Sequence, residues 1–89
     1  MDEKFQGNDN YGKPKKDYLD KLSKLSDEEL FTECKDKIWL SAYANNNPRS
    51  DYHWQVDACM LESAKRNKKA EEKSIYQEAF DKLSEELFG

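Results

Sequence analysis

The residues that could carry out catalysis lie between positions 41 and 57. His53 and Asp57 stand four residues apart, so on a helix the carboxylate could hold the imidazole in one tautomer for general-base catalysis. The nucleophile would have to be Ser41 or Ser50, yet no glycine-rich strand-to-helix turn exposes either hydroxyl. A histidine and an aspartate at this spacing more often form a surface or interhelical hydrogen bond. We therefore predict that the chain has no catalytic residues and is not an enzyme.

The two cysteines are the next candidates for chemistry. Cys34 lies 13 residues before Asn47 and Cys59 lies 12 residues after it, so a helical hairpin bent at that point brings both to the same level. A disulfide, half of a metal site and two buried thiols are all compatible with this placement. Helix axes about 8–10 Å apart favour thiols over a disulfide, which needs Cα atoms about 4.4–6.8 Å apart. With His53 as the only histidine, we predict reduced core cysteines, no metal and no cofactor.

Aromatic side chains gather around a polar segment in the middle of the chain. Both tryptophans lie within 16 residues of each other and flank an asparagine-rich turn. Tryptophan, tyrosine and arginine are enriched at the energetic centres of protein interfaces, so the predicted partner-binding residues are Trp39, Tyr43, Asn46, Asn47, Arg49, Asp51, Tyr52, His53 and Trp54. The alternative is that these rings complete a core that is poor in leucine and valine.

The elements that position these residues are expected to be helices. No glycine occurs between Lys15 and Gly89, Pro48 is the only proline in that stretch, and apolar residues recur at helical spacing. We predict an all-α fold, a three- to four-helix bundle built on an antiparallel hairpin of residues 27–44 and 51–66. Residues 1–14 are predicted to be a flexible arm, residues 15–25 a first helix, and residues 15–89 a single domain.

Helix boundaries carry the most specific local signals. Ser26 to Glu29 form a capping box, and Leu25 and Leu30 flank it as a hydrophobic staple. Residues 45–50 form a turn by composition, with Ser50 as the next helix cap. The stripe expected to face the core from the second helix consists of Leu30, Phe31, Cys34, Ile38 and Ala42.

The connection after position 66 is ambiguous in the sequence. No glycine or proline interrupts residues 62–74, so one long helix is an alternative to a break followed by a fourth helix. Ser74 to Gln77 resemble another capping box, which favours the break. The last helix is expected to present one apolar face, made by Tyr76, Phe80, Leu83 and Leu87, with Ile75 and Ala79 at its edge.

Composition limits the classes of function. The 89 residues carry a net charge of −4, and Leu, Ile, Val and Phe number only 15, so the core is small and self-association would help to complete it. The acidic balance argues against a general nucleic-acid binder. A nucleic-acid module that uses the basic segment Lys65–Lys73 and Arg49 is the alternative function. Apolar runs are too short to span a bilayer, so we expect a cytoplasmic protein without membrane contact.

One segment resembles known sequences. IWLSAYANNNPRSDYHWQVDAC, residues 38–59, is similar to a segment of small uncharacterised bacteriophage proteins and covers 22 of the 89 residues. The resemblance implies a viral setting and assigns no activity. Small acidic phage proteins often bind host proteins stoichiometrically. We therefore predict a non-enzymatic protein-binding module, a phage inhibitor of a host or anti-phage defence protein, which acts in the host cytoplasm and forms a homo-oligomer.

Overall fold

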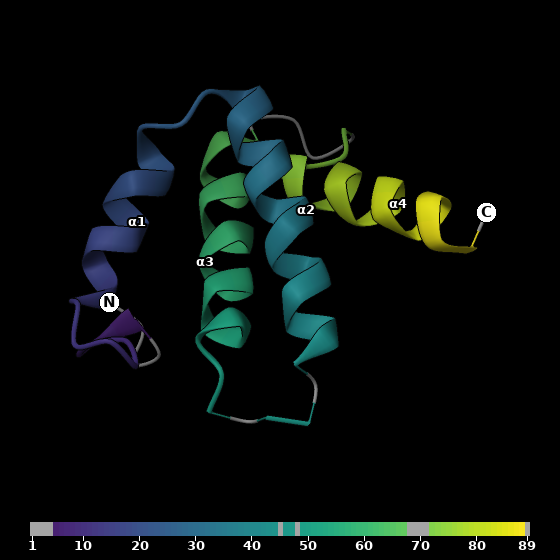
Figure 1. Cartoon of the computed structure of the whole chain (residues 1–89). Coiled ribbons are helices and arrows are strands. Elements are labelled where there is room, and N and C mark those ends of the chain that lie inside the picture. The colour runs from purple at the N-terminus through teal and green to yellow at the C-terminus, as the bar shows by residue number, and fades with distance from the viewer. Residues whose placement is uncertain (1–4, 45, 48, 68–71, 89) are drawn as a thin grey trace.

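Four helices make up the fold. The computed structural model describes residues 5–44, 46–47, 49–67 and 72–88. Its helices are α1 (Lys15–Ser23), α2 (Asp27–Tyr43), α3 (Asp51–Arg66) and α4 (Ile75–Phe88). Helices α2 and α3 form an antiparallel hairpin, α1 lies against α3, and α4 packs on α2 and crosses it at a steep angle (Figure 1). The predicted all-α bundle on a central hairpin is confirmed.

Small side chains let the hairpin helices approach closely. Leu30, Cys34 and Ile38 follow one another at four-residue intervals on α2 and are buried, as predicted, whereas Phe31 is half-buried and Ala42 is exposed. The buried hydrophobic residues are Phe5, Leu22, Leu30, Cys34, Ile38, Ala58, Cys59 and Ala79. On α3 the buried positions carry mainly alanine, cysteine and serine. The core is therefore compact rather than large, as expected from the few branched aliphatic residues.

The start of α2 confirms the predicted capping box. The Ser26 hydroxyl accepts a hydrogen bond from the Glu29 amide at 3.1 Å, and the Ser26 amide donates to the Glu29 carboxylate at 2.9 Å. Leu25 packs against the core and Leu30 is fully buried. Two otherwise unpaired amides at the helix start are thus satisfied by side chains.

The capping box makes part of the stability depend on pH. Hydrogen bonds from the backbone and side chain of Ser26 lower the pKa of Glu29 below its usual value. Because the folded state holds this proton less tightly than the unfolded chain does, the contribution is present above the ordinary glutamate pKa. It is lost as pH falls through the lower folded-state pKa. In urea unfolding, the advantage of the wild type over Glu29→Gln should be measurable at neutral pH and disappear in strong acid. An equal difference at both pH values would contradict this.

The described part of the predicted N-terminal arm, residues 5–14, contacts the helices. Phe5 is buried in the core, and the Asn10 amide donates to the Asp51 carboxylate at 3.1 Å. The backbone turns back on itself at Gly7 and Gly12, whose φ angles of 78° and 83° are easily adopted only by glycine. Residues 5–14 are therefore attached to the bundle by the buried Phe5 side chain and by the hydrogen bond from Asn10 to Asp51.

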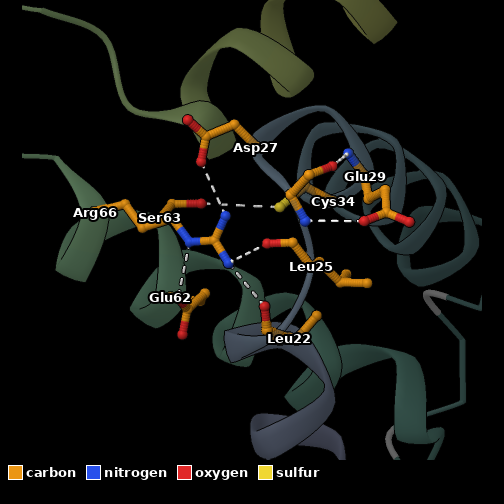
Figure 2. Close-up of polar contacts among 9 residues, drawn as sticks. Leu22, Leu25, Asp27, Glu29, Cys34, Glu62, Ser63 and Arg66 are labelled. Carbon is orange, nitrogen blue, oxygen red and sulfur yellow. Dashed lines mark hydrogen bonds and ion pairs between the residues drawn. The ribbon is translucent and has the colours of Figure 1, made fainter.

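Arg66 joins three helices at the opposite end of the hairpin. Its Nε donates to Glu62 at 2.8 Å and one terminal nitrogen donates to Asp27 at 2.9 Å. The other terminal nitrogen donates to the carbonyl oxygens of Leu22 and Leu25 at 2.9 and 2.7 Å. Figure 2 shows the guanidinium group in the corner between the end of α1 and the start of α2. One side chain thus donates to the Leu22 carbonyl near the end of α1, to the Leu25 carbonyl in the connection that follows and to two carboxylates.

The break between the third and fourth helices is confirmed, although residues 68–71 lie outside the described part. Helix α3 ends at Arg66 and α4 begins at Ile75, and the Ser74 hydroxyl accepts from the Gln77 amide at 3.1 Å.

The buried face of α4 is centred on one edge of the predicted face. Ala79 is buried, and Tyr76 and Leu83, which lie three residues before it and four residues after it, pack against the core on the same side of the helix. Phe80 and Leu87 of the predicted face instead stay 44% and 48% exposed. The C-terminal part of α4 extends beyond α2 (Figure 1), so less of its surface meets the bundle.

Candidate protein-binding surface

Two exposed aromatic rings lie side by side on α2. Trp39 is 46% exposed and Tyr43 is 83% exposed. They are four residues apart, so they share one side of the helix, and their ring centroids are 6.4 Å apart with an interplanar angle of 40°. The helix therefore holds a paired aromatic surface toward solvent near the end of the hairpin.

Trp54 is part of the scaffold between α1 and α3. Its ring meets Tyr18 edge to face at a centroid distance of 5.5 Å, and the Lys15 ammonium lies 5.2 Å from its centroid. The indole N–H donates to the Asp51 carboxylate at 2.9 Å. Trp54 is half-buried, so most of its area is already used in holding α1 against α3.

Tyr52 also faces the bundle. The Lys37 ammonium lies 5.7 Å from its ring centroid and 3.5 Å from the Glu33 carboxylate. Tyr52 is half-buried. The structure thus divides the predicted aromatic group: Trp39 and Tyr43 face solvent on α2, whereas Tyr52 and Trp54 contact neighbouring helices.

His53 cross-links the hairpin. Its Nδ1 lies 2.7 Å from the Ser41 hydroxyl oxygen and its Nε2 lies 3.0 Å from the Asn47 carbonyl oxygen. Because a carbonyl can only accept, Nε2 carries the proton and the Ser41 hydroxyl donates to Nδ1 in the neutral ring. Ser41 lies within α2, where its hydroxyl is engaged with the imidazole. His53 therefore makes an interhelical hydrogen bond with Ser41.

The turn between α2 and α3 presents polar groups. Asn46, Asn47 and Arg49 are exposed, and the Asn47 side-chain oxygen accepts from the Arg49 amide at 3.2 Å. The predicted turn residues at 45 and 48 lie outside the described part. We call Trp39, Tyr43, Asn46, Asn47 and Arg49 the tip surface. It is the exposed half of the predicted set.

Comparison with protein families, curated proteins and solved structures found no significant match. The bacteriophage resemblance of residues 38–59 stays a prediction. The function must therefore be argued from the surface itself.

The cysteines form a buried polar cluster with Tyr18. Both thiols are free and fully buried. The Cys34 sulfur lies 3.8 Å from the Ser63 hydroxyl, and the Cys59 sulfur lies 3.7 Å from the Tyr18 hydroxyl. The hydrogen bond with Cys34 and burial raise the pKa of Cys59, so this thiol stays protonated and unreactive. The reduced, buried cysteines match the prediction.

The predicted basic segment is partly used inside the fold. Arg66 donates to neighbouring helices as described, and the Lys73 ammonium pairs with Asp81 at 2.6 Å. Lys65 is exposed, and the lysines at 68 and 69 lie outside the described part. Fewer of these cations are free to meet phosphate groups than the sequence indicates.

Within the described ranges, no group of three histidine, cysteine, aspartate or glutamate side chains is arranged to hold a metal ion. The helices found there are too short or too polar to cross a bilayer.

Sequence reasoning missed Asn10 as a contributor to this end of the molecule. Besides binding Asp51, its side-chain amide donates to the Arg49 carbonyl at 2.7 Å. Asn10 thereby fixes the backbone next to the tip surface. A single asparagine in a polar stretch gives no pattern from which a contact across 39 residues could be found.

Proposed function

We propose that this chain is a small non-enzymatic module that binds another protein through the tip surface. The observation that carries the proposal is the exposed Trp39–Tyr43 pair at the end of α2 that leads into the asparagine turn. Because of the bacteriophage resemblance, the proposed partner is a host or anti-phage defence protein. The chain would inhibit it stoichiometrically in the host cytoplasm, by covering the surface to which it binds.

The energetics of association support this surface over the rest of the hairpin. Aromatic rings and arginine contribute most strongly when a partner desolvates them fully. The ring contact between Trp39 and Tyr43 already limits their rotation, so less side-chain entropy is lost on binding. Tyr52 and Trp54 would contribute indirectly, because their area is already in contact with the bundle.

Alanine substitutions on the tip surface test the proposal. The intact chain, immobilised, is used to capture the partner from host extract, and the affinity of the purified partner is then measured. Trp39→Ala and Tyr43→Ala should each weaken binding about 30-fold, which corresponds to about 2 kcal/mol. Met60→Ala is the matched control, since Met60 is also 46% exposed but lies on α3. Equal retention by all folded variants would refute the tip surface.

The alternative nucleic-acid function has less support. Arg49 and Arg66 lie at opposite ends of α3, whose 16 residues span about 24 Å, and Arg66 is bound within the fold. Binding to DNA or RNA that weakens steeply between about 50 and 200 mM salt would favour this alternative.

Self-association through α4 is a second part of the proposal. Phe80 and Leu87 are exposed and seven residues apart, so they lie on one side of the helix. A second copy could bury this stripe against its own, which would extend a small core. Light scattering should give twice the mass of one chain at high concentration, and Phe80→Glu should restore the single mass. A single mass for the wild type at every concentration would contradict this.

A further inference from the structure

The segment before α1 closes into a hydrogen-bonded loop. The Asp9 amide donates to the Lys13 carbonyl at 2.7 Å, and the Lys15 amide donates to the Gly7 carbonyl at 3.0 Å. The Asp9 carboxylate accepts from the amides of Tyr11 and Lys13 at 2.8 and 2.9 Å. Because these backbone groups are paired within the segment, the loop has a defined conformation before any partner binds.

This loop displays Tyr11 to solvent. The Tyr11 side chain is 88% exposed, and within the described residues it has no hydrogen-bond or ring partner. It therefore contributes little to the stability of the fold. Tyrosine is enriched at the energetic centres of interfaces, since it brings a large contact area with few rotatable bonds. An ordered loop also reduces the entropy that is lost on binding.

The loop lies against the turn that carries Arg49. The side-chain amide of Asn10 donates to the Arg49 carbonyl at 2.7 Å, and its backbone amide donates to the Asp51 carboxylate at 3.1 Å. Tyr11 and Asn47 line the same depression in the surface. Tyr11 therefore adjoins the tip surface on the side of the N-terminal segment.

The unpaired charges at this place are positive, although the chain carries a net charge of −4. Arg49 and Lys13 are exposed, and neither side chain has an ion-pair partner within the described residues. The carboxylates of Asp9 and Asp51 already accept hydrogen bonds from amides of the loop. An unpaired guanidinium group near an exposed ring suits a carboxylate that is carried by a partly apolar segment.

We propose that Tyr11 and Arg49 form an anchor pair that binds an acidic segment of the protein partner. The Arg49 guanidinium would donate to a carboxylate of this segment, and the Tyr11 ring would pack on an apolar side chain next to it. This inference rests on the proposed function, because Arg49 belongs to the tip surface. Nucleic acid suits the anchor pair less well, since the net charge of −4 opposes a long run of phosphates.

The test uses the intact chain and a synthetic acidic peptide. Ac-Glu-Glu-Leu-Glu-Glu-amide is titrated at low salt, and amide chemical shifts are followed by NMR. Saturable shifts are expected at Tyr11, Asn47 and Arg49, with a Kd in the millimolar range. The peptide with glutamine in place of glutamate should bind at least about tenfold more weakly, because charged hydrogen bonds are the stronger ones. Equal binding of the two peptides, or tighter binding of a thymidine octanucleotide, overturns the proposal.

Two pairs of substitutions separate the anchor pair from other exposed side chains. Tyr11→Ala and Arg49→Gln should each weaken peptide binding about fivefold. Both should leave Tm unchanged, because Tyr11 is exposed and the hydrogen bonds of Arg49 run through its backbone. Phe88→Ala, also at 88% exposure, and Lys65→Gln, at another exposed cation, should leave binding unchanged. Equal effects of the two pairs overturn the proposal.

The order of the loop is measured in the free chain. Backbone order parameters for residues 9–13 from ¹⁵N relaxation should be near those of the helices, about 0.85. Values below about 0.6 would show a flexible loop that does not hold Tyr11 in place, and they too overturn the proposal.

Failure of this inference can be distinguished from failure of the proposed function. If the acidic peptide does not bind while Trp39→Ala and Tyr43→Ala lose the protein captured by the wild type, the anchor pair alone is wrong. If the peptide binds at Tyr11 and Arg49 but the Trp39 and Tyr43 variants retain the captured protein, the proposed function is wrong.

Discussion

Replacing Arg66 with alanine should lower the free energy of unfolding by about 3 kcal/mol. The substitution removes the donors to Glu62, Leu22 and Leu25 at once. Glu62 is buried, and a buried carboxylate without its partner is costly. The two carbonyl groups lie at the end of α1 and the start of the α1–α2 connection, so we expect α1 to lose much of its attachment to the hairpin.

Urea unfolding and thermal melting followed by circular dichroism measure this effect. In a chain of this size a loss of about 3 kcal/mol corresponds to a fall in Tm of roughly 12–24 °C. Arg66→Lys should retain little of the stability, because an ammonium group cannot donate along the same diverging directions. Lys65→Ala is the matched control and should stay within about 0.5 kcal/mol of the wild type. A similarly small change for Arg66→Ala would show that the network is dispensable.

Substitution of the two tryptophans should have different effects, on stability for Trp54 and on partner binding for Trp39. Trp54→Ala removes the ring between α1 and α3 and leaves Tyr18 without its aromatic partner, so we expect a loss of about 3 kcal/mol. Trp39→Ala removes a ring that is about half exposed and should cost less than about 1 kcal/mol. Its expected effect is on partner binding.

Hydrogen exchange locates the damage caused by Trp54→Ala. Amides of α1 should exchange faster than in the wild type, whereas those in the middle of α2 should keep more of their protection, because the Trp54 ring makes its aromatic contact with Tyr18 of α1. Trp54→Phe should recover part of the stability by restoring an aromatic contact. Equal destabilisation by the two alanine variants would contradict the division between scaffold and surface.

Local signals account for most of the predicted helices. The cap residues Ser26 and Ser50 place the starts of α2 and α3 correctly, because each contact lies within one turn of chain. The first helix ends at Ser23 rather than at the predicted residue 25. Leu25 is instead part of the connection and packs beside the capping box of the next helix.

Contacts between distant residues could not be predicted from the sequence. Arg66 belongs to a run of cations that is typical of a solvated helix end, yet its partners other than Glu62 lie 39 to 44 residues away. Phe5 is an isolated apolar residue in a polar segment, so no hydrophobic periodicity predicts that its side chain is buried. The rotation of α4 was missed because both faces carry apolar residues, and packing on α2 selected the one centred on Ala79.

The candidate surface was only half predictable for a related reason. Composition placed the aromatic residues near the hairpin turn, but the sequence does not say which rings the first helix covers. Helix α1 packs against α3, where Tyr18 contacts the Trp54 ring. Trp39 lies on α2 and stays exposed.

Polar bridges hold α3 near both of its ends, with His53 bonded to Ser41 at one end and Arg66 bonded to Asp27 at the other. Sliding one hairpin helix past the other by a single residue would break both bridges. The paired rings are therefore displayed in one fixed register. Docking would then proceed as rigid-body collision and alignment, with a rate set by diffusion and orientation rather than by refolding of the hairpin.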